Sequence, residues 1–138
     1  NAYGTTKKSV EEARARGKNV ILDVDTIGAM KIRALCPDAT LIYILPPSWD
    51  ELKSRLSSTG IYTEEEVNAL MEIAEEEISC ANSYDYILVN DTISNTLSRF
   101  AQIIHSNRYS RNCMKEFLDS YIDGEVKPHV QSYKEALL

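Results

Sequence analysis

The sequence predicts an α/β fold in which helices cover both faces of a parallel sheet. Three short apolar runs rich in β-branched residues predict buried strands over residues 19–25, 40–45 and 84–89. Segments whose apolar residues recur at helical spacing lie before, between and after these runs. Nearly continuous apolar strands that alternate with helices are typical of three-layer parallel sheets with right-handed crossovers. With 138 residues, of which 43% are hydrophobic, the chain can form one such core.

The first part of the chain predicts a helix, a strand and a second helix. The helix over residues 7–16 is followed by Gly17, a residue type that commonly ends helices. The strand over residues 19–25 ends in acidic residues, and a helix then continues to about Leu35. We expect this strand to lie in the buried sheet.

The middle of the chain predicts a second strand followed by two helices. Pro46 stops the strand, because proline lacks the amide hydrogen that the sheet needs. Ser48 is placed to cap the helix that comes next. Thr63 and Glu66 have the spacing of a capping box, which predicts a second, longer helix. Residues 57–62 are then a loop between the two helices.

The last part of the chain predicts a third strand, a helix and a tail. The strand over residues 84–89 precedes an apolar stripe at helical spacing from Ile93 to Ile104. After residue 107, apolar residues recur at helical spacing at Cys113, Phe117 and Tyr121. We therefore expect one domain over residues 1–107 and an appended helical tail over residues 108–138.

Composition and charge exclude several classes of protein. The longest apolar runs are far shorter than the roughly 20 residues that a membrane-spanning helix needs, and the first residues show no secretion signal. The net charge of −6 does not fit the basic surface with which proteins bind nucleic acids. Widely separated cysteines, odd in number, fit reduced thiols. We expect a cytoplasmic protein that binds neither membranes nor nucleic acids.

Polar residues follow each of the three predicted strands. Asp23 and Asp25 end the first strand, Ser48 comes after the second, and Asn90 and Asp91 follow the third. Ligands of open parallel sheets bind at the carboxyl ends of the strands. We therefore expect these side chains to gather at one edge of the sheet.

Several short motifs follow one another along the chain. They are Tyr3-Gly4-Thr5, Ile21-Leu22-Asp23-Val24-Asp25, Gly28, Pro46-Pro47-Ser48, Arg55-Leu56, Tyr84-Asp85-Tyr86 and Val89-Asn90-Asp91. Their order and spacing, from residue 1 to about 105, resemble the guanylate kinase family. The resemblance implies a P-loop NTPase fold of the nucleoside monophosphate kinase type, with a lid at about residues 57–70. It also implies transfer of the terminal phosphoryl group of ATP to GMP with Mg2+, a reaction of purine nucleotide metabolism.

The resemblance implies GMP-binding roles for three residues. Tyr3 stands where the family has a tyrosine that contacts the phosphate of GMP, and Thr5 where a hydroxyl contacts guanine. Asp25 matches an aspartate that accepts hydrogen bonds from guanine. A structural alternative stays open for each. Residues 3–5 could form a turn ahead of a helix that Thr5 or Thr6 caps, and Asp25 could cap the helix that follows it.

On the ATP side, the resemblance implies that Asp23 holds a hydrated Mg2+ ion and that Asn90 contacts the adenine base. A carboxylate suits Mg2+, which keeps much of its water shell in proteins. Alternatively, Asp23 ends a strand, and Asn90 lies beside residues that cap the next helix. Gly28 either allows the backbone to approach the nucleotide closely or is a small residue in a tight strand-to-helix connection.

The lid of the family carries arginines that stabilise the charge on the transferred phosphoryl group. Arg55 resembles one of them and is the predicted catalytic residue, although it could also be a solvated helix residue. Thr59 and Leu70 stand where the resemblance implies two further arginines. Their absence predicts a weaker kinase.

The phosphate-binding loop of the family is absent from the sequence. The only Gly-Lys pair, at Gly17, is followed by Asn19 and not by serine or threonine. We therefore expect the N-terminal part of the fold to be missing and this chain alone to be inactive. The alternative is a non-catalytic guanylate kinase-like module that binds protein partners.

Overall fold

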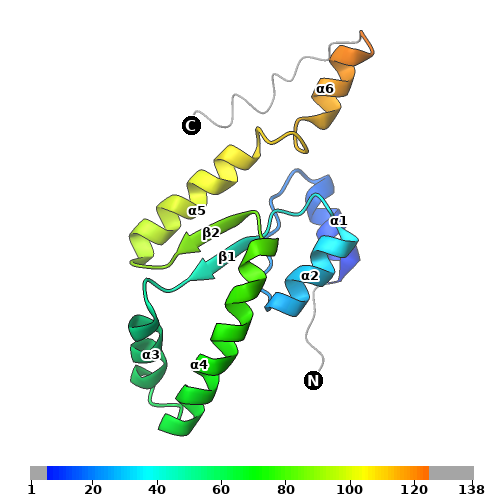
Figure 1. Cartoon of the computed structure of the whole chain (residues 1–138). Helices are drawn as coiled ribbons and strands as arrows, with labels where there is room; N and C mark the ends of the chain where they lie inside the picture. Colours follow the sequence, from blue (N-terminus) through cyan, green and yellow to red (C-terminus); the bar gives the residue numbers. More distant parts are fainter. Residues whose placement is uncertain (1–5, 125–138) are drawn as a thin grey trace.

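The structure is a computed structural model that describes residues 6–124. Two short strands lie between helices that extend well beyond them (Figure 1). In chain order the elements are α1 (Lys7–Ala15), α2 (Thr26–Leu35), β1 (Ile42–Leu45), α3 (Trp49–Ser58), α4 (Glu64–Ile78), the 3-10 helix η1 (Ser79–Ser83), β2 (Tyr86–Val89), α5 (Ile93–Asn107) and α6 (Lys115–Ile122). The predicted α/β class is confirmed.

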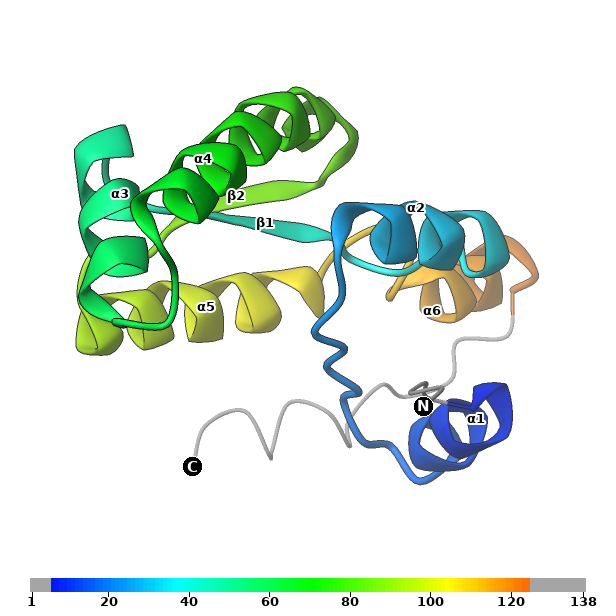
Figure 2. The same ribbon diagram turned by 90° about the horizontal axis from the view of Figure 1, so that it is seen from below.

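Strands β1 and β2 are parallel neighbours and form the sheet of the described residues. Ile42 pairs with Tyr86 and Leu45 pairs with Val89, so the two strands end at the same edge. Helix α4 covers one face of the sheet and α5 covers the other (Figure 2). The three layers that the sequence predicts are therefore present.

Side-chain caps explain where five of the helices begin. In each, a side-chain oxygen of the preceding residue accepts a hydrogen bond from a backbone N–H of the first turn. The capping residues are Thr6, Asp25, Ser48, Thr63 and Thr92. Thr63 and Glu66 form the reciprocal capping box that their spacing predicts.

The strand predicted over residues 19–25 is not formed in the structure. These residues pair with neither β1 nor β2, and Ile21 and Val24 remain 66% and 44% exposed. The physical reason is that a strand needs backbone hydrogen bonds from a neighbouring strand, and none within residues 6–124 lies beside this segment. Helices α1 and α2 on either side form because their hydrogen bonds are internal.

The core of the described chain lies between the sheet and its helices. Five apolar residues are buried: Ala29, Leu41, Val67, Ala81 and Leu88. Beside them, the rings of Tyr43 and Tyr84 pack edge to face with centroids 4.9 Å apart. Burial raises the pKa of both phenols above their ordinary value of 10.0.

An ion pair joins the amino ends of the two strands. Asp85 directly precedes β2, and its Oδ2 accepts hydrogen bonds from Arg33 at 2.6 Å and from the backbone N–H of Leu41 at 2.7 Å. Arg33 also donates to the carbonyl oxygens of Pro37 and Ala39. These contacts fix where β1 begins relative to β2.

Helix α6 lies within the predicted tail. Phe117 and Tyr121 stack edge to face along it, with ring centroids 5.2 Å apart. Across residues 6–124, each helix is too short or too polar to cross a membrane. The division of the chain at residue 107 stays a prediction.

Candidate functional site

Asn90 lies at the carboxyl end of β2, and both its backbone and its side chain are held. Its backbone N–H donates to the carbonyl oxygen of Leu45 at 2.7 Å, which continues the pairing of the sheet by one residue. Its side-chain Oδ1 accepts a hydrogen bond from the hydroxyl of Thr96 on α5 at 3.1 Å. Asn90 therefore sits in a fixed position between the sheet and α5.

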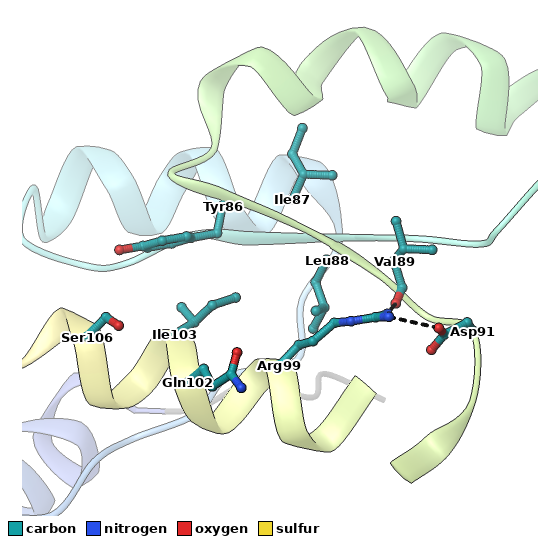
Figure 3. A pocket seen from close by; sticks show the side chains of 9 residues that line it. All are labelled: Tyr86, Ile87, Leu88, Val89, Asp91, Arg99, Gln102, Ile103 and Ser106. Carbon is teal, nitrogen blue, oxygen red and sulfur yellow. Dashed lines mark hydrogen bonds and ion pairs between the residues drawn. The ribbon is translucent and has the colours of Figure 1, made fainter. Parts of the chain in front are cut away.

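Asp91 anchors the turn that follows Asn90. Its Oδ1 accepts a hydrogen bond from the backbone N–H of Thr92 at 2.6 Å, and its Oδ2 pairs with Arg99 at 3.0 Å (Figure 3). Arg99 also donates to the carbonyl oxygen of Val89 at 3.2 Å. The hydrogen bond from Thr92, supported by Arg99, lowers the pKa of the Asp91 carboxyl below its ordinary value of 3.8.

Arg55 reaches the same turn from the last part of α3. Its Nε pairs with Glu51 one helical turn earlier at 2.8 Å, and its guanidinium donates to the carbonyl oxygen of Asp91 at 3.3 Å. The structure thus brings the predicted catalytic arginine beside the predicted adenine-side residue Asn90. The arginine is half-exposed, with 38% of its side chain accessible, so it can still meet a ligand.

A groove of about 650 Å3 runs between β2 and α5. Tyr86, Leu88 and Ile103 form much of its apolar wall, and Asp91 and Arg99 stand at one end (Figure 3). Of the predicted binding and catalytic residues that lie within residues 6–124, none lines it. The groove therefore meets the candidate site only at the pair formed by Asp91 and Arg99.

The two predicted aspartates lie away from Asn90. Asp25 caps α2, because its Oδ1 accepts a hydrogen bond from the backbone N–H of Gly28 at 2.6 Å. Its charge acts on Tyr84, which precedes β2, whereas Asn90 follows that strand. The expectation that all these polar groups gather at one edge is wrong for this structure. The segment that carries the aspartates is not part of the sheet, so nothing aligns its end with those of β1 and β2.

The cap of α2 leaves no room for a side chain at position 28, where the sequence has glycine. A Cβ at this position would lie 2.9 Å from Oδ1 of Asp25 and 3.1 Å from Cβ of Val24. Both distances are shorter than ordinary contacts, so a larger residue would disturb the turn. In this structure the tight connection to α2 accounts for the glycine.

Within residues 6–124 the structure offers few donors for Mg2+. Among the residues that the structure describes, no three acidic, histidine or cysteine side chains lie close enough to bind a metal ion. Asp23 is exposed, and Asp25 uses one carboxylate oxygen for its cap. Because Mg2+ in nucleotide sites takes one or two carboxylates and otherwise waters and phosphates, a lone Asp23 fits an outer ligand of a hydrated ion.

The remaining predicted positions divide between described and undescribed residues. Tyr3 and Thr5 lie outside the described range. Of the two positions without the expected arginines, Thr59 is the C-terminal cap of α3 and Leu70 lies in the middle of α4. Sequence reasoning missed Thr96, whose only signal is that it lies one helical turn after the cap residue Thr92.

Comparison with solved structures shows the class of fold. A crystal structure of guanylate kinase from Anaplasma phagocytophilum superposes on the chain with a TM-score of 0.64 at 26% sequence identity. The match covers 88% of this chain and 58% of that one. The described residues therefore share the P-loop NTPase fold.

Sequence comparisons show the family. The profile of the guanylate kinase family matches residues 1–107. A guanylate kinase from Clostridium acetobutylicum is 39% identical over 134 residues, which are 96% of this chain and 63% of that protein. One from Francisella tularensis is 44% identical over 108 residues, or 78% of this chain and 57% of that protein. The chain belongs to the guanylate kinase family, and it spans about 60% of the length of these relatives.

Proposed function

We propose that this chain forms part of an ATP:GMP phosphotransferase. In the proposed reaction an oxygen of the GMP phosphate attacks the γ-phosphorus of ATP, the bond to the β–γ bridging oxygen breaks, and GDP and ADP leave. The relatives are named guanylate kinases, and the chain is similar to them over most of its length. The chain spans about 60% of the length of those relatives, and the proposed activity is that of a whole guanylate kinase.

One observation carries the proposal, namely that Arg55 contacts the turn after β2. Arg55 of α3 donates to the backbone carbonyl oxygen of Asp91, the residue that directly follows Asn90 at the end of β2. In phosphoryl transfer, fixed cations stabilise the charge spread over the transferred group. We infer that Arg55 supplies such a cation and that Asn90 contacts the base of ATP.

The other half of the proposed site comes from the N-terminal residues. Tyr3, Thr5 and Asp25 are the proposed contacts to GMP, and Asp23 is the proposed outer ligand of Mg2+ that arrives with ATP. The cap contact of Asp25 uses Oδ1, so Oδ2 remains the oxygen proposed to meet guanine. Purine nucleotide metabolism in the cytoplasm is the proposed setting.

Calorimetry with two proteins tests the proposal. GMP, and separately ATP with Mg2+, would be titrated into this chain and into the longest protein that its gene encodes. We expect the longer protein to bind both and to form GDP from them, and the chain alone to turn over nothing. A longer protein that binds both nucleotides but forms no detectable GDP would contradict the catalytic proposal.

A non-catalytic protein-binding module is the second candidate. Thr59, the cap of α3, and Leu70, within α4, occupy the two lid positions where the resemblance implies arginine. A module of this kind would bind neither nucleotide in the calorimeter. It would instead bind a protein partner, and a phosphorylated peptide is the first probe to titrate.

A further inference from the structure

The hydroxyl of Thr96 makes an unusual hydrogen bond for a threonine inside a helix. A helical threonine commonly donates its hydroxyl to the backbone carbonyl four residues earlier. Here the backbone N–H of Thr96 donates to the carbonyl oxygen of Thr92 at 2.9 Å, while the hydroxyl donates to Oδ1 of Asn90 at 3.1 Å. A hydroxyl has one proton to donate, and Thr96 donates it to Asn90. The side chain therefore donates no hydrogen bond to the backbone of α5.

The backbone around Asn90 is already held by its neighbours. Its backbone N–H is bound to Leu45 of β1, and the next residue, Asp91, is held by Thr92 and Arg99. The rotation of the side-chain amide is what remains. With Oδ1 accepting from Thr96, the two N–H groups of Nδ2 stay available as donors.

We propose that Thr96 is a positioning residue that orients the amide of Asn90, so that Nδ2 donates to an acceptor nitrogen of the purine base of ATP. This inference rests on the proposed contact between Asn90 and ATP. Both side chains are partly buried, which limits competition from water for the bond between them. A site residue held in advance loses less conformational entropy when its ligand binds.

The test compares the affinities of variants for ATP with Mg2+ and for GMP by calorimetry on the longest encoded protein. Thr96→Val removes the hydroxyl and keeps the shape, Thr96→Ser keeps the hydroxyl, and Ser98→Ala removes an exposed hydroxyl from the same helix. We expect Thr96→Val to weaken ATP binding about threefold to tenfold. GMP binding should not change, and Thr96→Ser and Ser98→Ala should bind ATP as the parent does.

A purely structural role would give a different pattern. It would lower the melting temperature of Thr96→Val and leave the affinity for ATP unchanged, or weaken both nucleotides equally, and either result would overturn the inference. Asn90→Ala separates the two proposals. If it weakens ATP binding and Thr96→Val does not, only the role of Thr96 is wrong. If Asn90→Ala leaves ATP binding unchanged, the proposed contact and the inference are both wrong.

Discussion

The two ends of β2 each carry an aspartate paired with an arginine, and the two pairs have different roles. Before the strand, Asp85 binds Arg33 at 2.6 Å and also accepts from the backbone N–H of Leu41. After the strand, Asp91 binds Arg99 at 3.0 Å, and its backbone carbonyl accepts from Arg55. The first pair therefore joins α2 and the start of β1 to β2, and the second joins α5 to the turn that Arg55 of α3 also contacts.

The difference shows that the neighbours of an ion pair decide its role. The partners of Asp85 hold the start of β1 and the loop before it, so the pair stabilises the sheet. The turn at Asp91 instead gathers groups from β1, α3 and α5 around Asn90. We therefore propose a structural role for the amino end of β2 and ligand binding for its carboxyl end.

The largest expected effect is a loss of kcat when a residue that contacts the turn at the carboxyl end of β2 is changed. Arg55→Ala in the longest encoded protein should lower kcat about a hundredfold, because a fixed cation near the transferred phosphoryl group is lost. Steady-state kinetics measure this change. Lys53→Ala, an exposed change on the same helix, is the matched control and should leave kcat unaltered. A loss below twofold for Arg55→Ala would remove the arginine from the proposed site.

At the amino end, Asp85→Ala should lower stability and not nucleotide affinity. It leaves the backbone N–H of Leu41, a buried residue, without its acceptor, which costs about 1–3 kcal/mol in the free energy of unfolding. Urea unfolding measures the change, with Asp38→Ala on an exposed turn as the control. If Asp85→Ala were to weaken ATP binding while stability stayed the same, the roles assigned to the two ends would be reversed.

A smaller effect separates the two aspartates before α2. Asp25→Ala removes the cap of α2 and should lower the free energy of unfolding by about 1 kcal/mol. Asp25→Asn should keep most of this stabilisation, because asparagine also caps helices. Asp23→Ala, at an exposed position, should change stability by less than about 0.5 kcal/mol. Thermal unfolding measures all three variants. Equal losses for Asp23→Ala and Asp25→Ala would mean that the cap is not what stabilises this connection.

The smallest effect is the pH dependence that Asp91 contributes. Its pKa is lowered in the folded protein from an ordinary value of 3.8, so the carboxylate adds stability that is complete above that value. This stability is lost as the pH falls through the lowered pKa. The difference in unfolding free energy between the parent and Asp91→Asn should therefore shrink as the pH is lowered from 7 to about 3. A difference that stays constant over this range would contradict the role of the ionised carboxylate.

The sequence predicts helices better than strands here, and the physical reason lies in where their hydrogen bonds go. Thr63 and Glu66 specify the start of α4 by themselves, and the prediction is confirmed. Residues 19–25 have the composition of a strand, yet they form none, because strand pairing depends on residues elsewhere in space.

The same limit applies to the candidate site. The turn after β2 could be predicted because a strand that does form ends there, and Asn90 is held as part of it. The contact between Arg55 and Asp91 joins residues 36 apart in sequence, and no local pattern specifies it. The bond from Thr96 to Asn90 was likewise not predictable, since a threonine in this place satisfies the helix pattern equally well without it.

The most direct test of the division between the two ends of β2 is a titration of ATP with Mg2+ into the 15N-labelled longest encoded protein, followed by NMR. We expect the resonances of Asn90, Asp91 and the Arg55 side chain to shift, and those of Arg33 and Asp85 to stay in place. Shifts confined to Arg33 and Asp85, or no shift at any of the five residues at saturating ATP, would contradict the assignment of ligand binding to the carboxyl end.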